Sequence, residues 1–247
     1  MNLDGSRHAV AVGGPAAHSR LSYLRARPRE AFRLVLVHGT PGEARQWADY
    51  LKEPPHNVEV IAIDRPGFGV SDPDGPVVSL AAQAAAVAAL LGAGDRPCVL
   101  LGHSLGGAIV AQAAALHPAR ITAVVLIAAA LDPALERIHP LQHVGAWPPV
   151  RALLGRTLRN ANAELVALKP QLECLAPLLP TITAPVVIVH GTADDRVPFA
   201  NVAYLQRALT GARRVETVVL EGANHFLPWN AANAVRAAIS RALELSC

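Results

Sequence analysis

The sequence predicts an α/β fold: a mostly parallel, eight-stranded sheet with helices on both faces. The alternation of two kinds of segment carries this prediction. Short apolar runs that suit strands buried on both faces alternate with Ala- and Leu-rich stretches of helical length. Alternation of this kind brings the strands together in one sheet and packs the connecting helices against both of its faces.

Eight segments have the pattern of strands. The first two, at 9–12 and 20–26, are expected to form an opening hairpin around Gly13, Gly14 and Pro15. The other six are continuous apolar runs, typical of buried strands, at 33–39, 58–64, 97–104, 121–130, 185–191 and 214–222.

Helical patterns fill most of the intervening chain. Ser79 is a suitable N-cap for a helix over 79–91 that Gly92 ends, and Pro118 ends a second helix over 105–117. Three further helices are expected over 43–53, near 199–210 and near 230–245.

The segment 132–184 breaks the alternation. It is rich in Leu and Pro, has short helical patterns and contains no strand pattern. We therefore expect 1–131 and 185–247 to form the core, and 132–184 to be an excursion over the carboxyl ends of the strands. Open parallel sheets place their sites at that edge.

Composition excludes several classes of protein. Of the 247 residues, 52% are hydrophobic and 17% are charged, which is too apolar for an intrinsically disordered chain. The net charge is only +3 and aromatic residues are 4%, without the dense basic stripe of a nucleic-acid binder. The three cysteines, Cys98, Cys174 and Cys247, have neither disulfide-framework nor metal-ligand spacing.

The sequence also favours a cytoplasmic protein. Asp4, Arg7 and His8 stand where a signal peptide would have its apolar stretch. The longest apolar stretch, 77–93, is interrupted by polar residues and is short for a membrane span. We expect no membrane-spanning helix.

The strongest candidate for a reactive residue is Ser104, in the sequence Gly-His-Ser-Leu-Gly-Gly at 102–107. The motif lies where a predicted strand runs directly into a predicted helix, which is the setting of a nucleophile elbow. Glycines two residues before and after the serine allow the tight, strained turn that exposes its hydroxyl. The N-terminus of the following helix would stabilise negative charge that develops there.

A serine hydroxyl needs a base that is oriented by an acid, and after such an elbow the acid precedes the histidine. His225, in the loop after the last predicted strand, is the best candidate for the base. The other downstream histidines are His117 and His190, which end a helix and a strand, and His139 and His143 within 132–184. For His190 we expect a structural role.

Asp194 is the favoured acid because it follows the preceding strand. Its neighbour Asp195 is the alternative, although such a neighbour is more often solvated. Asp132 is a third possibility, since it follows the strand at 121–130, but Pro133 makes it a good helix N-cap.

An oxyanion hole would complete the site, because the oxyanion needs backbone N–H donors. Leu105, directly after the serine, is expected to supply one. The second should come from the loop at 38–42, where Pro41 has no N–H and Thr40 is the natural donor. We also expect the Thr40 hydroxyl to contact the oxyanion.

Together these motifs resemble the α/β-hydrolase fold superfamily, in order and in spacing. The matching stretches are HGTPG (38–42), DRPGFGVSD (64–72), GHSLGG (102–107), HGTADDRVP (190–198) and GANH (222–225). The resemblance implies Ser104 as nucleophile, Asp194 as acid, His225 as base, and Thr40 with Leu105 as oxyanion donors. It also implies a small helical cap at 132–184, because the HGxPG start is similar to that of the cap-bearing branch.

The resemblance implies a serine hydrolase, and we expect a carboxylesterase. Epoxide hydrolases and haloalkane dehalogenases of this fold use an aspartate where this chain has Ser104, so both are disfavoured. A hydrolase of C–C, thioester or lactone bonds with the same triad remains an alternative. So does a catalytically silent ligand-binding protein of this fold.

Apolar residues near the predicted site favour an uncharged, fairly apolar small-molecule ester. The candidates for the pocket are Phe68, Trp147, Val197 and Phe226. The charges of Asp64 and Arg65, just before Phe68, are expected to be structural. No phosphate loop, dinucleotide fingerprint or metal-ligand cluster is present, so no cofactor or metal is expected. We expect a monomer or a small homo-oligomer.

Overall fold

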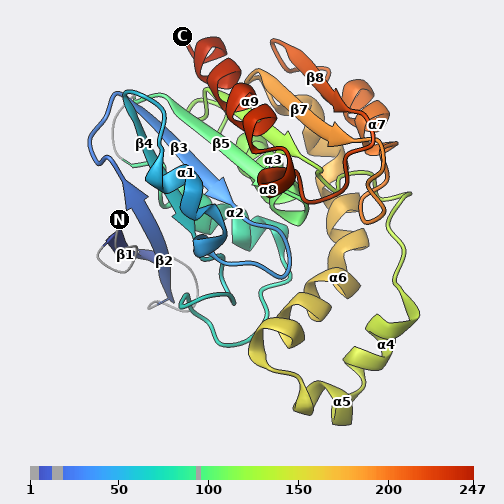
Figure 1. The fold of residues 1–247 in the computed structure, drawn as a ribbon. Coiled ribbons are helices and arrows are strands. Elements are labelled where there is room, and N and C mark those ends of the chain that lie inside the picture. The colour runs from blue at the N-terminus through green and yellow to red at the C-terminus, as the bar shows by residue number, and fades with distance from the viewer. Residues whose placement is uncertain (1–5, 13–18, 93–95) are drawn as a thin grey trace.

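The computed structural model describes residues 6–12, 19–92 and 96–247, and it confirms the predicted alternation of strands and helices (Figure 1). The turn expected at Gly13, Gly14 and Pro15 lies outside the described residues. The strands are β1 (Arg7–Val12), β2 (Ser19–Ala26), β3 (Phe32–Val37), β4 (Val58–Ile63), β5 (Cys98–His103), β6 (Ala123–Ile127), β7 (Val186–Gly191) and β8 (Val215–Leu220).

Every helix that the sequence pattern predicts outside 132–184 is present. The helices there are η2 (Ala44–Trp47, 3₁₀), α1 (Ala48–Lys52), α2 (Leu80–Ala88), α3 (Leu105–Leu116), α7 (Asn201–Ala208), α8 (Leu227–Asn230) and α9 (Ala232–Leu245). The short helix α8 is an addition that the pattern did not predict. The hydroxyl of Ser79 caps α2 by accepting a hydrogen bond from the Ala82 N–H, at 3.2 Å, as the sequence predicts.

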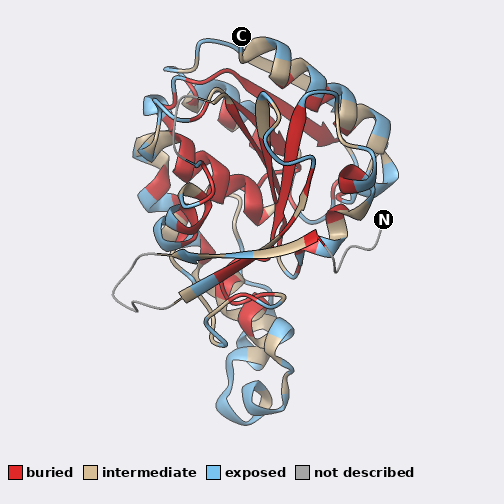
Figure 2. Cartoon of the chain, turned by 90° about the vertical axis from the view of Figure 1, so that its left-hand side faces the viewer, coloured by how far each residue is buried: buried red, intermediate tan, exposed pale blue. Residues whose placement is uncertain are grey.

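The sheet has eight strands in the order β1-β2-β4-β3-β5-β6-β7-β8. The pairs β1–β2 and β2–β4 are antiparallel, and every later pair is parallel. The prediction of a mostly parallel sheet is therefore confirmed. Both faces are covered, which Figure 2 shows as a buried sheet between helices.

Alternate residues of the central strands enter two separate hydrophobic clusters. In β3, Val35 and Val37 pack with α2 and α3, whereas Leu34 and Leu36 pack with α1 and α9. This is the period of two that a strand imposes on its side chains. It explains why the central strands are apolar at nearly every position.

The segment 132–184 contains four helices and no strand. They are α4 (Pro140–Ala146), α5 (Pro148–Leu153), α6 (Arg156–Leu175) and η3 (Ala176–Thr181, 3₁₀). The pair α4–α5 projects from the body of the molecule, and none of its residues is buried (Figures 1 and 2). The second half of α6 is different, because Leu168, Leu172 and Leu175 belong to the main hydrophobic cluster.

Only the first part of 132–184 therefore protrudes, and the rest is part of the helical layer on the sheet. The division into a core and a separate cap stays a prediction. Among the described residues, no helix combines the length and the apolar character that crossing a membrane requires. The expected cytoplasmic location also stays a prediction.

Substitutions along 132–184 can test where the core ends. Leu172 is 0% exposed and Leu153 is 87% exposed. We expect Leu172→Ala to lower the free energy of unfolding by about 2–5 kcal/mol, because it removes buried methyl groups and leaves a cavity. The matched variant Leu153→Ala should change it by less than about 0.5 kcal/mol. Urea denaturation measures both, and equal small losses would contradict a core role for α6.

Candidate active site

The candidate residues follow strands that end at one edge of the sheet. The register pairs Val37 of β3 with Gly102 of β5, and Gly102 with Leu126 of β6. It also pairs Ile127 of β6 with Val189 of β7. The loops that carry the candidate residues therefore start close together, although they are far apart in sequence.

Ser104 stands on a tight turn between β5 and α3. Its φ of 56° and ψ of −126° are unusual for a residue with a side chain. A Cβ atom at Gly102 would overlap the backbone of Gly106, and one at Gly106 would overlap the backbone of Val37. The two glycines of the motif are thus required by close backbone contacts.

Asp194 and His225 form a hydrogen-bonded pair. His225 Nδ1 lies 2.8 Å from Asp194 Oδ2, and the other carboxylate oxygen accepts the N–H groups of Arg196 and Val197. Burial alone would raise the pKa of Asp194, but hydrogen bonds from His190, His225 and the Val197 N–H outweigh it. They hold the pKa well below its usual range. The carboxylate is therefore charged, and Nδ1 of His225 carries the proton that it donates to it.

The alternative acids lie elsewhere. Asp195 is exposed, with its carboxylate 3.8 Å from the guanidinium of Arg196. Asp132 accepts the N–H of Ala134 within a short turn. The helix that Pro133 was expected to start is absent from the described residues, where α4 begins only at Pro140. In the part of the chain that the structure describes, neither carboxylate contacts a histidine.

The other candidate histidines have different surroundings. His117 ends α3, His139 caps α4 by accepting the Leu141 N–H, and His143 lies within α4. His190 is fully buried, and its Nε2 lies 3.0 Å from the carbonyl oxygen of Val197 and 3.5 Å from Asp194 Oδ2. It therefore supports the loop that holds Asp194.

His103 is a residue of the site that the sequence analysis did not single out. Its Nε2 lies 3.0 Å from the carbonyl oxygen of His225, and the two ring centroids are 4.8 Å apart. Burial, with repulsion from the nearby His225, lowers the pKa of His103 to about 4. The ring is thus neutral near pH 7 and donates to the His225 carbonyl. The only signal in the sequence was its position directly before Ser104.

Ser104 and His225 lie in the same region of the structure, because His103, the residue before Ser104, contacts His225. Among the described residues, the Ser104 hydroxyl itself makes no hydrogen bond. In unliganded enzymes, catalytic hydrogen bonds are often long and tighten only when substrate binds.

The loop of Thr40 packs against the turn of Ser104. A Cβ atom at Gly39 would lie 2.9 Å from Ser104 Cβ, so only glycine allows this approach. In the described part of the chain, the N–H groups of Thr40 and Leu105 make no hydrogen bond, and the buried Thr40 Oγ1 has no partner. Both expected donors are therefore unused.

The four candidate pocket residues have different surroundings. Val197 is buried and its N–H holds Asp194, and Phe68 is buried against His38 and Arg65. Phe226 is 44% exposed beside His225, with ring centroids 5.7 Å apart. Trp147, between α4 and α5, is 62% exposed. A pocket role for these residues stays a prediction.

A cavity of about 430 Å³ lies beside α5 and α6, and its lining residues include neither the pocket candidates nor the Asp194–His225 pair. It is lined by Asp74, Gly75, Pro76, Pro148, Arg151, Ala152 and Arg159. Within the described ranges, no three His, Cys, Asp or Glu side chains are grouped so that they could hold a metal ion.

A mostly parallel sheet of eight strands, with a serine on a strand-to-helix turn near an Asp–His pair, defines a hydrolase of the α/β class. The chain belongs to the alpha/beta hydrolase family, whose sequence model matches residues 34–238. This confirms the fold and the family that the sequence motifs predict.

Similar proteins agree with this assignment. The chain is 28% identical over 228 residues to a pimeloyl-[acyl-carrier protein] methyl ester esterase of Aeromonas hydrophila, covering 78% of this chain and 87% of the relative. It is 30% identical over 222 residues to a non-heme chloroperoxidase of Streptomyces lividans, covering 71% and 79%. An esterase structure from Thermogutta terrifontis superposes with a TM-score of 0.71 at 20% identity, covering 97% and 98%, and shows the fold alone.

Acid conditions should destabilise the protein through His103. Its pKa is about 4 in the folded chain and about 6.5 when unfolded, so the unfolded chain binds the proton first as pH falls. The free energy of unfolding should fall between pH 6.5 and 4, by up to about 3 kcal/mol from this residue.

Urea denaturation at pH 7.5, 6 and 4.5 measures this effect. His103→Gln keeps a donor for the His225 carbonyl and should weaken the dependence on pH. Part of the dependence should remain, because burial also lowers the pKa of His38. The exposed His56 provides the matched control, because His56→Gln should keep the wild-type dependence. An unchanged profile in His103→Gln would show that the buried ring is not its source.

Proposed function

We propose that the protein is a serine esterase with Ser104 as nucleophile, His225 as base and Asp194 as acid. The observation that carries the proposal is the 2.8 Å hydrogen bond between His225 and Asp194, next to the strained turn of Ser104. The similarity to a methyl ester esterase supports an ester as substrate.

In the first step, the Ser104 hydroxyl attacks the ester carbonyl while His225 Nε2 takes its proton. Nε2 can accept because Nδ1 carries the proton that is donated to Asp194. The charged carboxylate then stabilises the imidazolium that forms. His225 next protonates the alcohol as it leaves, and an acyl-enzyme remains on Ser104.

Negative charge develops on the carbonyl oxygen during attack. We propose that the unused N–H groups of Thr40 and Leu105 stabilise this charge by donating hydrogen bonds to the oxyanion, together with the Thr40 hydroxyl. Leu105 is the first residue of α3, so its N–H belongs to the positive end of that helix. In the second step, His225 activates a water that releases the acid.

For the substrate we propose a small, uncharged and fairly apolar ester. Phe226 and Trp229 support this, because their rings lie beside those of His225 and His103 and both side chains are partly exposed. They offer apolar surface next to the reacting groups.

Hydrolysis of a series of p-nitrophenyl esters of increasing acyl length tests the proposal. We expect the wild-type protein to release p-nitrophenol, and Ser104→Ala to lose at least about a thousandfold in kcat, because the nucleophile is removed. Turnover that survives in Ser104→Ala would contradict the assignment. No turnover in a folded wild-type protein would favour the C–C, thioester or lactone alternatives, or a binding protein.

Neighbouring aspartates allow a matched test of the acid. Asp194→Asn should lower kcat by about 10³–10⁴-fold, because the amide cannot stabilise the imidazolium and favours the wrong tautomer. Asp195→Asn removes an exposed charge and should leave kcat within about twofold. Steady-state kinetics on the best ester distinguishes them, and the reverse pattern would assign the acid to Asp195.

A further inference from the structure

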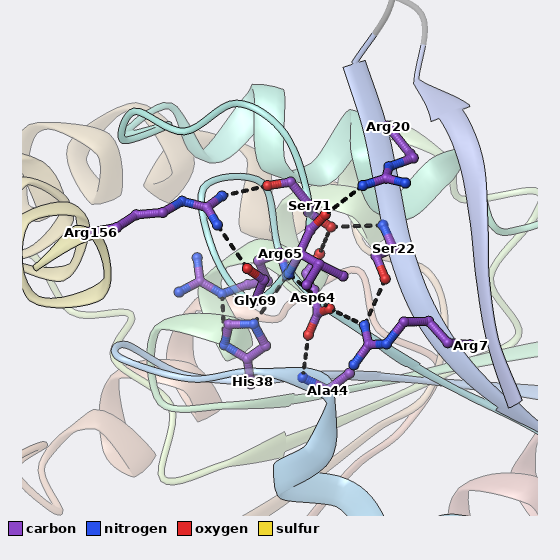
Figure 3. A network of polar contacts seen from close by, with 11 residues as sticks. Arg7, Arg20, Ser22, His38, Ala44, Asp64, Arg65, Gly69, Ser71 and Arg156 are labelled. Atoms are coloured by element: carbon purple, nitrogen blue, oxygen red, sulfur yellow. Dashed lines mark hydrogen bonds and ion pairs between the residues drawn. The ribbon is translucent and has the colours of Figure 1, made fainter. Parts of the chain in front are cut away.

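One face of α6 carries a polar stripe formed by Arg156, Asn160 and Glu164, spaced four residues apart. The stripe contacts the loop at 64–75, which follows β4. Arg156 donates to the carbonyl oxygens of Gly69, Ser71 and Pro73, and Asn160 donates to those of Gly67 and Asp74. Figure 3 shows Arg156 reaching this loop from α6.

Glu164, the third member of the stripe, forms a buried ion pair with Arg65. The two guanidinium nitrogens lie 2.7 and 3.0 Å from the two carboxylate oxygens, and both side chains are at most 2% exposed. Gln83 of α2 also donates to Glu164. Asp64, by contrast, pairs with Arg7 of β1, so the two adjacent charges have separate partners.

Arg65 also reaches the loop that carries Thr40. Its Nη2 donates to the carbonyl oxygen of Gly39 at 2.9 Å. His38 Nδ1 lies 2.7 Å from the same oxygen and carries the proton, because its Nε2 accepts the backbone N–H of Arg65. Burial and the Arg65 charge keep the pKa of His38 well below its usual value, so the ring stays neutral. Two donors thus fix one carbonyl group (Figure 3 shows His38 beside Arg65).

Because two donors hold the Gly39 carbonyl in one orientation, the orientation of the following N–H group, that of Thr40, is also set. In a planar trans peptide the C=O and the following N–H point in opposite directions. The Gly39 carbonyl points to Arg65, so the Thr40 N–H points away from Arg65. Gly39 itself packs against Ser104.

We propose that Arg65, held by Glu164, is a positioning residue that aims the Thr40 N–H at the oxyanion. The inference rests on the proposed function and deepens it, because it links α6 to the oxyanion hole. Arg65 contacts no reacting atom and acts through the Gly39–Thr40 peptide.

A purely structural role is a poor explanation of this pair. Burying two charges costs desolvation energy, and an apolar pair of similar volume often gives equal or greater stability. Arg156 and Asn160 already fasten the same loop to α6. What the guanidinium adds is a donor for Gly39, which an apolar side chain cannot supply.

The test replaces both charges at once, in Arg65→Met/Glu164→Met. This variant leaves no unpaired buried charge, so we expect its melting temperature to stay within a few degrees of the wild type. We expect kcat on the best p-nitrophenyl ester to fall roughly 10- to 100-fold. The fall is partial because His38 still holds Gly39. KM should stay within about twofold, because the lost interaction acts in the transition state.

Arg156→Met is the matched control, since Arg156 fastens the same loop without contacting Gly39. It should lower the melting temperature and leave kcat near the wild-type value. A folded double variant with wild-type kcat, or an equal loss of kcat in Arg156→Met, would overturn the proposal. If the methionine pair does not fold, Arg65→Gln/Glu164→Gln applies the same test, because glutamine is too short to reach both partners.

A second measurement separates this inference from the proposed function. The rate at which an organophosphonate labels Ser104 also depends on the oxyanion donors. Wild-type protein that neither hydrolyses esters nor is labelled would count against the proposed function. Wild-type protein that is labelled, with the double variant labelled equally fast, would overturn only the role of Arg65.

Discussion

The backbone at Ser104 is the constraint around which the rest of the site is arranged. A side-chain-bearing residue with a φ of 56° is strained, and its surroundings must hold it there. The Ser104 N–H donates to the carbonyl oxygen of Ile127, and glycines at 102 and 106 leave room for the crossing backbone. Gly39 then packs against the serine, and the neighbouring His103 binds the loop of His225. One turn thus brings three distant loops together.

Hydrogen-bond partners and burial determine which side chains in this region are charged. Asp194 and Glu164 are buried carboxylates that accept several hydrogen bonds each, whereas the buried rings of His38 and His103 are kept neutral. Each of these two buried negative charges therefore has hydrogen-bond donors or a positive charge beside it. The arrangement leaves the N–H groups of Thr40 and Leu105 as unused donors beside Ser104.

Local pattern was sufficient for the sheet but not for long-range contacts. All eight strands were predicted: six from continuous apolar runs, because a strand buried on both faces has few polar positions, and the first two from a hairpin pattern. The 20-residue helix α6 was not, because Pro170 within it suggests a break. The Arg65–Glu164 pair joins residues 99 positions apart, and nothing near either residue indicates the other. The pairing of His225 with Asp194 was anticipated only because motif order restricts the choice.

Substitutions in the projecting helices α4 and α5 should be tolerated more easily than substitutions in the second half of α6. The side chains of α4 and α5, such as Leu141 and Leu153, are largely exposed, and neither helix contains a buried residue. The polar stripe of α6 begins only after them. Amino-acid substitutions in α4 and α5 can therefore accumulate without moving the loops that surround Ser104. Divergence among descendants of this protein should accordingly be fastest at this tip, while the second half of α6 changes slowly.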